Sequence, residues 1–390
     1  MPLTRARLVR LCVLYCGQGM ANWIEIFDEN NPHDVPDANI LVDFGRSFFS
    51  KDAQSKSAAV NYIVGRLNEM GTARKVPSID WTIISHQDHD HWALLPPLTV
   101  HLRQFRFLKL GPITLGGALW SSACKAAIRA YAASVAPDAA QYIFNANVSD
   151  YGAPPAVGTY QTFGDVELRV LLARTTRITS TAPATIKNAT SAVVVVHFRG
   201  ASFLLPGDAT VETIAHINTL LAGYGHTTNP KPLDRCYSMS LPHHGASRTL
   251  QDTDGAFGTA RTFARFVEPE STAASAGYRN GHKHPQLGVI KVFQPYAQAG
   301  FAVENVVAFS AVGNDWTRFS NGGRGVFSTV VGLTEPVAFR RLNFNLTVTV
   351  GANGEETVVP SVEEIPIGQT SEPDRLPILA YPEPLANERN

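Results

Sequence analysis

The stretch Ser85–His91 constrains this chain most, because the six residues from His86 to His91 include five side chains that can bind a metal. It directly follows Trp81–Ile84, an apolar run that predicts a buried strand. Enzymes of the α/β class present ligands at the carboxyl ends of strands, as this order of residues would do. The alternative is a loop that is rich in His and Asp by chance. The density of ligand types directly after a strand argues against it.

Polar groups follow apolar strands at three further points in the chain. The run 201–205 ends before Asp208, the run 236–241 ends before His243 and His244, and the run 273–276 precedes a segment that contains His284. A layered α/β fold gathers the ends of such strands at one edge. A binuclear metal centre needs this arrangement, with ligands from several strands and one carboxylate shared by both ions.

The composition is that of a globular protein with a sizeable core. Hydrophobic residues make up 44% and charged residues 17% of the 390 residues. Lys plus Arg equals Asp plus Glu at 33 each, so no overall basic field attracts polyanions, and nucleic-acid binding would depend on a local patch.

We expect a cytoplasmic protein without a membrane span or signal peptide. The four cysteines include no pair of the CxxC type, which favours reduced core residues.

The first part of the chain predicts three strands, at 8–15, 23–27 and 39–42, with a tight turn at Gly17-Gln18-Gly19. Asp43 follows the third strand, and its side chain either makes a local turn or supports the site from beneath. Helical spacing of apolar residues predicts a helix within 53–70. We expect a short helix over 92–97 that ends at Pro96 and Pro97, and a return to strand character over 98–110.

One large domain is expected over 1–353. Residues 111–150 have no obvious counterpart in a minimal catalytic core, so we interpret them as a helical insertion that either covers the site or only packs on the fold. Glu, Pro and Asn dominate after this domain, which predicts a loosely ordered tail over 354–390.

The motif His86-x-Asp88-x-Asp90-His91 resembles the signature of the metallo-β-lactamase fold hydrolases, whose common form is His-x-His-x-Asp-His. Asp in the third place is similar to the hydrolase domain of the competence protein ComEC. Further matching segments follow the family's order over about residues 8–333: Gly17–Gly19, Ile40–Gly45, Asn188-x-x-Ser191, Phe203–Asp208, Leu241–Ala246, and Asn280 with His284-Pro285. The resemblance implies an α/β fold, a four-layered αβ/βα sandwich of two mixed sheets with helices outside.

The resemblance also implies roles for the site residues. His86 and Asp88 would hold a first metal ion, and Asp90 and His91 a second. Asp208 would bridge the two ions, and His243 would complete the second site. His244 is either a weak ligand or a supporting group, and His89 occupies a place in the motif that binds no metal. Asn188 stands where the wider fold has a histidine, which makes it a weak ligand or a substrate contact. His284 and Asn280 would approach the bound phosphate. His284 is the candidate for protonating the leaving group or stabilising the transition state.

The sequence departs from this family in two ways. Acidic residues usually flank the first turn, whereas this chain has Tyr15 and Met20 there, so the support beneath the site differs. The chain also lacks the membrane channel of the competence protein, and we expect a free-standing hydrolase for which DNA uptake is not implied.

These observations favour metal-dependent hydrolysis of a phosphodiester, in which a hydroxide held by two divalent ions attacks phosphorus. The carboxylate-rich ligand set favours manganese over zinc. The substrate would be DNA, RNA or a small nucleotide, with a partner protein and an oligomeric state left open. One alternative is hydrolysis of a carboxylic ester, lactone or β-lactam, against which the missing histidines argue. The other is a non-catalytic interaction module, against which the intact ligand set argues.

Overall fold

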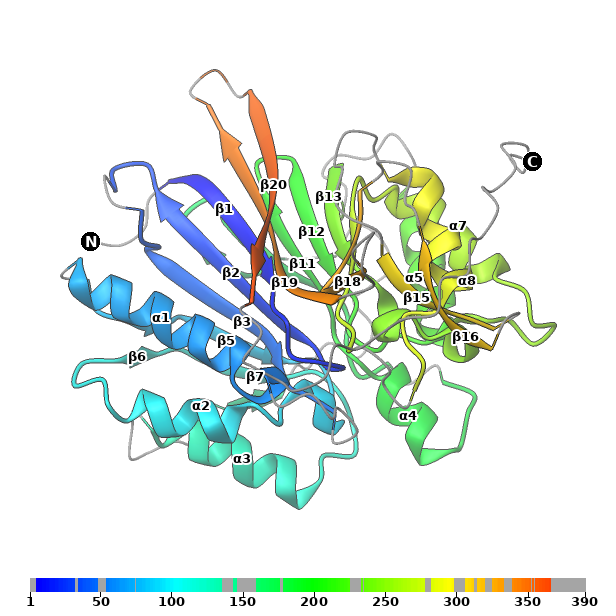
Figure 1. Ribbon diagram of the computed structural model, residues 1–390, viewed down its shortest axis with the longest axis horizontal. Helices are drawn as coiled ribbons and strands as arrows, with labels where there is room; N and C mark the ends of the chain where they lie inside the picture. Colours follow the sequence, from blue (N-terminus) through cyan, green and yellow to red (C-terminus); the bar gives the residue numbers. More distant parts are fainter. Residues whose placement is uncertain are drawn as a thin grey trace.

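Two large β-sheets face each other, and helices cover the outer face of each (Figure 1). The computed structural model describes residues 5–31, 34–47, 54–73, 75–134, 143–145, 159–175, 178–224, 233, 235–277, 282–297, 306–311, 314–319, 325–332, 339–351, 353 and 355–365. Within these residues, no helix combines the length and the apolar character needed to cross a membrane.

The first sheet has 11 strands. Their order is β16 (Asp315–Phe319), β15 (Val306–Ser310), β18 (Val330–Gly332), β19 (Phe339–Val350), β1 (Ala6–Val13), β2 (Ala21–Asp28), β3 (Ala38–Phe44), β5 (Trp81–Ile84), β7 (Ile113–Leu115) and β8 (Ile143–Asn145), and β20 (Glu356–Glu364) also pairs with β19. The strands from β3 to β8 are parallel, so the carboxyl ends of β3 and β5 lie at the same edge.

The second sheet has 7 strands. Their order is β17 (Val326–Ser328), β14 (Thr272–Ala274), β13 (Arg235–Ser240), β12 (Ala201–Leu205), β11 (Val193–Phe198), β10 (Val166–Leu172) and β9 (Thr159–Phe163). The strands β12, β13, β14 and β17 are parallel, which brings their carboxyl ends together. A separate pair joins β4 (Ser78–Ile79) to β6 (Lys109–Leu110).

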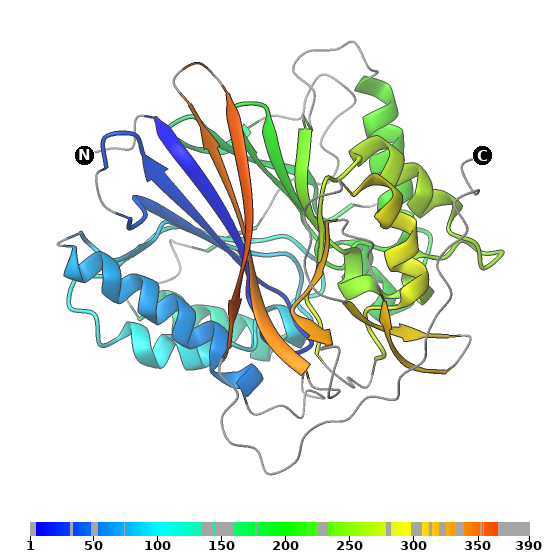
Figure 2. The same ribbon diagram turned by 45° about the horizontal axis from the view of Figure 1, so that its top comes forward.

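The helices form the two outer layers, which stay on opposite sides of the sheets when the molecule is turned (Figure 2). The first layer contains α1 (Ala58–Thr72), α2 (Leu95–Leu102) and α3 (Ser122–Ala132), and the second contains α5 (Val211–Tyr224), α7 (Gly258–Val267) and α8 (Leu287–Phe293). Shorter elements are α4 (Pro183–Ala189), α6 (Ser247–Leu250) and the 3-10 turns η1 (Gln54–Lys56), η2 (His89–His91), η4 (Pro242–Gly245) and η5 (Gln294–Tyr296).

Strand β11 shows why the sequence folds into four layers. Val194 and Val196 point into the core between the two sheets, whereas Val193 and Val195 point toward the outer helices. A strand that is covered on both faces reads as a continuous apolar run, and each fully buried valine contributes about 1.5–3 kcal/mol of transfer free energy. The four-layered αβ/βα sandwich expected from the sequence is therefore confirmed.

The expectation of a strand over 98–110 is wrong for its first part. Residues Leu95–Leu102 form α2, and the two prolines stand in its first turn. Proline is tolerated there because the first N–H groups of a helix have no partner within the helix. Pro96 and Pro97 therefore begin this helix rather than end it.

The predicted start of a loose tail at 354 is also wrong. Strand β20 is antiparallel to β19 and extends the first sheet. Leu342 is paired with Glu364 at one end of this ladder, and Val350 with Glu356 at the other. The glutamates of β20 and Pro360 hide this strand in the sequence, and most of its residues are at least partly exposed. Residues 366–390 lie outside the described part of the chain.

The proposed insertion at 111–150 is built into the first sheet where the structure describes it. Strands β7 and β8 extend the sheet in parallel, and α3 buries Ile128 and Tyr131 on its outer face. The connection between β7 and α3 runs beside the candidate site instead of joining the sheet. A Cβ atom at Gly117 would lie 2.8 Å from Cβ of His86, so this connection forms a wall of the site.

Candidate metal centre

The polar segments that follow four strands meet at one edge of the sandwich. Three backbone hydrogen bonds tie these segments to one another or to neighbouring turns: His243 donates to Gly207 over 3.0 Å, Ala192 to Ser85 over 3.0 Å, and Met20 to Asp90 over 2.9 Å. The short turns η2 and η4 lie beside each other, with Oδ2 of Asp90 3.5 Å from Nε2 of His244, although about 150 residues separate them in the chain. This arrangement is the one expected when ligands follow parallel strands.

Two glycines allow this close approach. A Cβ atom at Gly45 would lie 2.3 Å from the backbone nitrogen of His91. Gly207 has a φ of 54°, and a Cβ atom there would lie 2.9 Å from Oγ of Ser85. Larger residues at either position would displace the segment that carries the candidate ligands.

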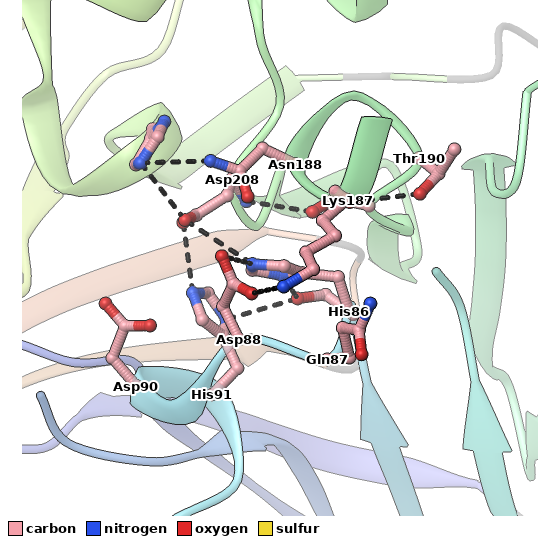
Figure 3. A network of polar contacts seen from close by, with 12 residues as sticks. His86, Gln87, Asp88, Asp90, His91, Lys187, Asn188, Thr190 and Asp208 are labelled. Carbon is pink, nitrogen blue, oxygen red and sulfur yellow. Dashed lines mark hydrogen bonds and ion pairs between the residues drawn. The ribbon is translucent and has the colours of Figure 1, made fainter. Parts of the chain in front are cut away.

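Asp208 lies at the centre of the cluster, and two imidazoles face each of its carboxylate oxygens. Figure 3 shows His86 and His91 beside it. Its Oδ1 is 3.0 Å from Nε2 of His91 and 3.5 Å from Nε2 of His244. Its Oδ2 is 3.5 Å from Nε2 of His86 and 3.3 Å from Nε2 of His243. The cluster therefore has two halves that share one carboxylate.

The remaining candidate ligands extend these halves. Oδ2 of Asp90 lies 3.5 Å from Nε2 of His244, on the Oδ1 side of Asp208. Oδ2 of Asp88 lies 4.0 Å from Nε2 of His86. Nδ2 of Asn188 lies 3.4 Å from Nε2 of His243, so these two side chains flank the other half.

Two groups of side chains place possible ligand atoms within 4.8 Å of one another. One consists of His86, His91 and Asp208, and the other of Asp90, His91 and His244. The structure brings all six predicted ligands to one place. It differs from the expectation in setting His244, rather than His243, beside Asp90 and His91.

Asp43 positions the imidazole of His91. Its Oδ2 accepts a hydrogen bond from Nδ1 of His91 over 2.9 Å, and its two oxygens accept bonds from the backbone N–H and the hydroxyl of Ser85, each over 2.7 Å. A carboxylate at Nδ1 leaves the Nε2 lone pair free for a metal, which is the usual arrangement around metal-binding histidines. Asp43 thus supports the site from beneath, one of the two roles considered for it.

The neighbouring histidines are oriented in the same way. Nδ1 of His86 lies 3.2 Å from the hydroxyl oxygen of Ser85, and Nδ1 of His244 lies 3.1 Å from the carbonyl oxygen of Ser275. Because Nδ1 of each ring is engaged, the Nε2 atoms face the carboxylates.

The cluster fits a bound cation on its own geometry. Among the described residues, the buried Nε2 atoms of His86, His91 and His244 and the Oδ1 atom of Asp208 make no well-formed hydrogen bond. Lone pairs of neutral imidazoles that face carboxylate oxygens are unfavourable unless a proton or a metal ion lies between them. Imidazole nitrogen and carboxylate oxygen are ligands for zinc and manganese.

The pKa values show where positive charge is needed. Burial opposes protonation of His91, yet Asp208 and Asp43 raise the pKa of His91 well above its ordinary value. Burial likewise opposes ionisation of Asp208, and the surrounding imidazoles, His243 foremost, still lower its pKa well below the ordinary range. Burial together with His91 lowers the pKa of His86, which keeps that ring neutral as a metal ligand must be.

His284 and His89 also lie at this centre. The ring of His284 is 5.9 Å from that of His243, and its side chain is buried. Burial lowers the pKa of His284 to about 3, with His243 and His244 contributing. Nδ1 of His89 lies 2.9 Å from the carbonyl oxygen of Arg46, as suits a residue between ligands. Asn280 lies outside the described residues.

Strained backbone aims the two adjacent histidines of η4. His243 has φ 47° and ψ 48°, and His244 has φ 53° and ψ 16°. Left-handed conformations cost a residue with a Cβ atom about 1–2 kcal/mol each and concentrate at functional sites. Sequence reasoning left the role of His244 open because this reversal of the backbone leaves no mark in the residue pattern.

This strain predicts that His243→Gly is about 1 kcal/mol more stable than His243→Ala, because glycine adopts positive φ without the Cβ clash. Unfolding in urea measures the difference between the two variants. The same pair of substitutions at His101, in the last turn of α2, is the control and should show the opposite order. Equal stability of the two variants at position 243 would contradict the strain.

Comparisons with known proteins find similarity to solved structures. No family model and no curated protein matches the sequence. The chain is similar to the metallo-β-lactamase fold protein YhfI from Bacillus subtilis, with 12% identity and a TM-score of 0.38, over 74% of this chain and 93% of that one. The layers and the strand ends described above show, from this chain's own structure, the four-layered αβ/βα sandwich that the motif His86-x-Asp88-x-Asp90-His91 predicts.

Proposed function

We propose that this protein is a metal-dependent hydrolase that cleaves phosphodiesters. The observation that carries the metal dependence is the convergence of four imidazole Nε2 atoms on the two oxygens of Asp208. A buried cluster of this kind needs positive charge between its members, which metal ions would supply, and a carboxylate with both oxygens engaged is suited to bridging two of them.

The two halves of the cluster suggest how the ions would be held. His86, Oδ2 of Asp208 and the nearby Asp88 would hold one ion, with His243 and Asn188 at its side. Asp90, His91, His244 and Oδ1 of Asp208 would hold the other. Two bound divalent ions would lower the pKa of water and neutralise charge on the phosphoryl group. Asp43 and Ser85 would keep the ligands in the required tautomers.

The choice of a phosphodiester rests on the residues that replace histidines of the wider fold. Asp88 and Asn188 stand where the common motif and its third segment have imidazoles. Together with Asp90 and Asp208 they make an oxygen-rich centre, which suits manganese, although zinc also accepts such ligands. Single-stranded DNA, RNA and small nucleotides all present the phosphodiester that such a centre would cleave.

The test is a panel of labelled DNA, RNA and cyclic dinucleotides, assayed with manganese, magnesium and zinc. We expect hydrolysis of at least one phosphodiester, and none after chelation of the metal. A chromogenic cephalosporin and a simple lactone belong in the same panel. Hydrolysis of these two without any phosphodiesterase activity would favour the carboxylic-ester alternative. Failure of the protein to bind any of the three metals would favour an interaction module.

His284→Ala should lower turnover about 100- to 1,000-fold, the usual effect of losing one group that stabilises transition-state charge. The imidazole lies beside His243 but belongs to neither group of possible ligands, so the metal content should not change. Its lowered pKa favours a neutral hydrogen-bond donor over an imidazolium acid. Turnover of bis-p-nitrophenyl phosphate and elemental analysis of the protein measure the two effects.

The exposed neighbour His282 supplies a control, because His282→Ala should leave both turnover and metal content unchanged. Loss of metal from the His284→Ala variant would instead make His284 a ligand.

A further inference from the structure

Lys187 brings a positive charge to the edge of the metal centre. It stands in the last turn of α4, directly before Asn188, and its side chain is 34% exposed. Its Nζ lies 3.4 Å from Oδ1 of Asp88, and Figure 3 shows it reaching from α4 toward this carboxylate. Nothing in the pattern of metal ligands requires a cation at this point.

The end of α4 holds this side chain in place. The hydroxyl of Thr190 donates to the carbonyl oxygens of Ile186 and Lys187, over 2.8 and 3.0 Å, and it accepts a bond from the backbone N–H of Ala118 over 3.1 Å. These bonds link α4 to the connection between β7 and α3, which forms a wall of the site. Lys187 therefore starts from a fixed backbone, which lowers the cost of placing its ammonium group.

Asp88 has two competing partners. Its Oδ1 faces Lys187, whereas its Oδ2 faces Nε2 of His86 at 4.0 Å. Partly exposed ion pairs stabilise a protein little, so a metal ion beside His86 would readily draw Asp88 away from the lysine. The ammonium would then lie next to the metal with no carboxylate committed to it.

We propose that Lys187 binds a non-bridging oxygen of the substrate phosphate and selects anionic phosphodiesters over neutral esters. This inference rests on the proposed function. A phosphodiester carries a negative charge that a lysine within hydrogen-bond reach attracts as a point charge, whereas a neutral ester offers it no such partner. In the free protein the ion pair with Asp88 keeps the ammonium at the site, and substrate replaces that carboxylate once metal is bound.

The test compares Lys187→Met with the wild type in three measurements. Affinity for manganese, measured calorimetrically, should rise several-fold, because a positive charge that competes for Asp88 is removed. Affinity of the manganese-loaded protein for inorganic phosphate should fall about 10- to 100-fold, the loss expected for one charge-assisted hydrogen bond. The kcat/KM for bis-p-nitrophenyl phosphate should fall by a similar factor, and Lys187→Arg should restore part of it.

The control is Lys109→Met, which removes another lysine that is paired with an aspartate, Asp80, at β6. It should leave all three measurements unchanged. A merely structural role of Lys187 would weaken manganese binding together with phosphate binding. Manganese affinity that falls or stays constant, or phosphate affinity that stays constant, overturns the proposal.

The result separates this proposal from the proposed function. If the wild type cleaves phosphodiesters and Lys187→Met binds phosphate as well as the wild type does, the lysine is wrongly assigned and the function stands. If the wild type cleaves none, the function fails, and the phosphate and manganese titrations still decide whether Lys187 binds an anion at the metal centre.

Discussion

Asp208→Ala should lower the hydrolysis of bis-p-nitrophenyl phosphate by at least about 1,000-fold, because both metal ions would lose their shared ligand and several kcal/mol of transition-state stabilisation with it. Four imidazoles face the oxygens of Asp208 within 3.0–3.5 Å, and no other described carboxylate faces all four. Steady-state kinetics and elemental analysis measure the loss of activity and of metal.

Asp208→Asn provides a variant of nearly the same size. It keeps one acceptor oxygen but loses the charge, so we expect it to retain the fold and to lose most of the bound metal. Circular dichroism checks that both variants are folded. A folded Asp208→Ala protein that keeps its metal and its activity would rule out the bridging role.

Asp43→Asn should weaken metal binding about 10- to 100-fold without removing any ligand, the usual effect of losing the hydrogen-bond partner of a metal-binding histidine. Asparagine tolerates the φ of 57° at this position, so the backbone stays as it is. Its amide NH2 can point at Nδ1 of His91 and favour the tautomer that carries its proton on Nε2, where the metal would bind. Calorimetric titration with manganese or zinc measures the change.

Asp37→Asn is a matched control remote from the metal centre. The carboxylate of Asp37 also accepts hydrogen bonds from the backbone of Asp28 and from Asn31, and it pairs with Lys75. This variant should lose stability but keep its metal affinity. If both variants bind metal equally well, Asp43 does not orient His91.

The identity of the candidate ligands was predictable because each follows an apolar strand in the chain. The motif at His86–His91 follows β5, Asp208 follows β12, and the two histidines follow β13. Parallel pairing brings the ends of β12 and β13 together within the second sheet, and the two facing sheets bring the end of β5 to the same edge, so the order of strand and ligand predicted one cluster. The apolar runs of β3 and β11, covered on both faces, likewise predicted the buried sheets.

Local signals failed where tertiary contacts outweighed them. Pro96 and Pro97 are compatible with the start of a helix and with its end, and only packing against the first sheet decides between these. The polar strand β20 is held by its hydrogen bonds to β19 rather than by an apolar pattern. Propensity alone therefore placed both boundaries incorrectly.

The layered α/β fold and the set of side chains that could bind metal follow from the amino-acid sequence, because both depend on the order of residues along strands. How that set is divided into two halves depends on the packing of distant segments. The left-handed backbone at His243 and His244 turns each imidazole to a different oxygen of Asp208. The approach of α4 sets Lys187 beside Asp88, across a separation of 99 residues. Such positions depend on how distant segments pack, and no local pattern encodes them.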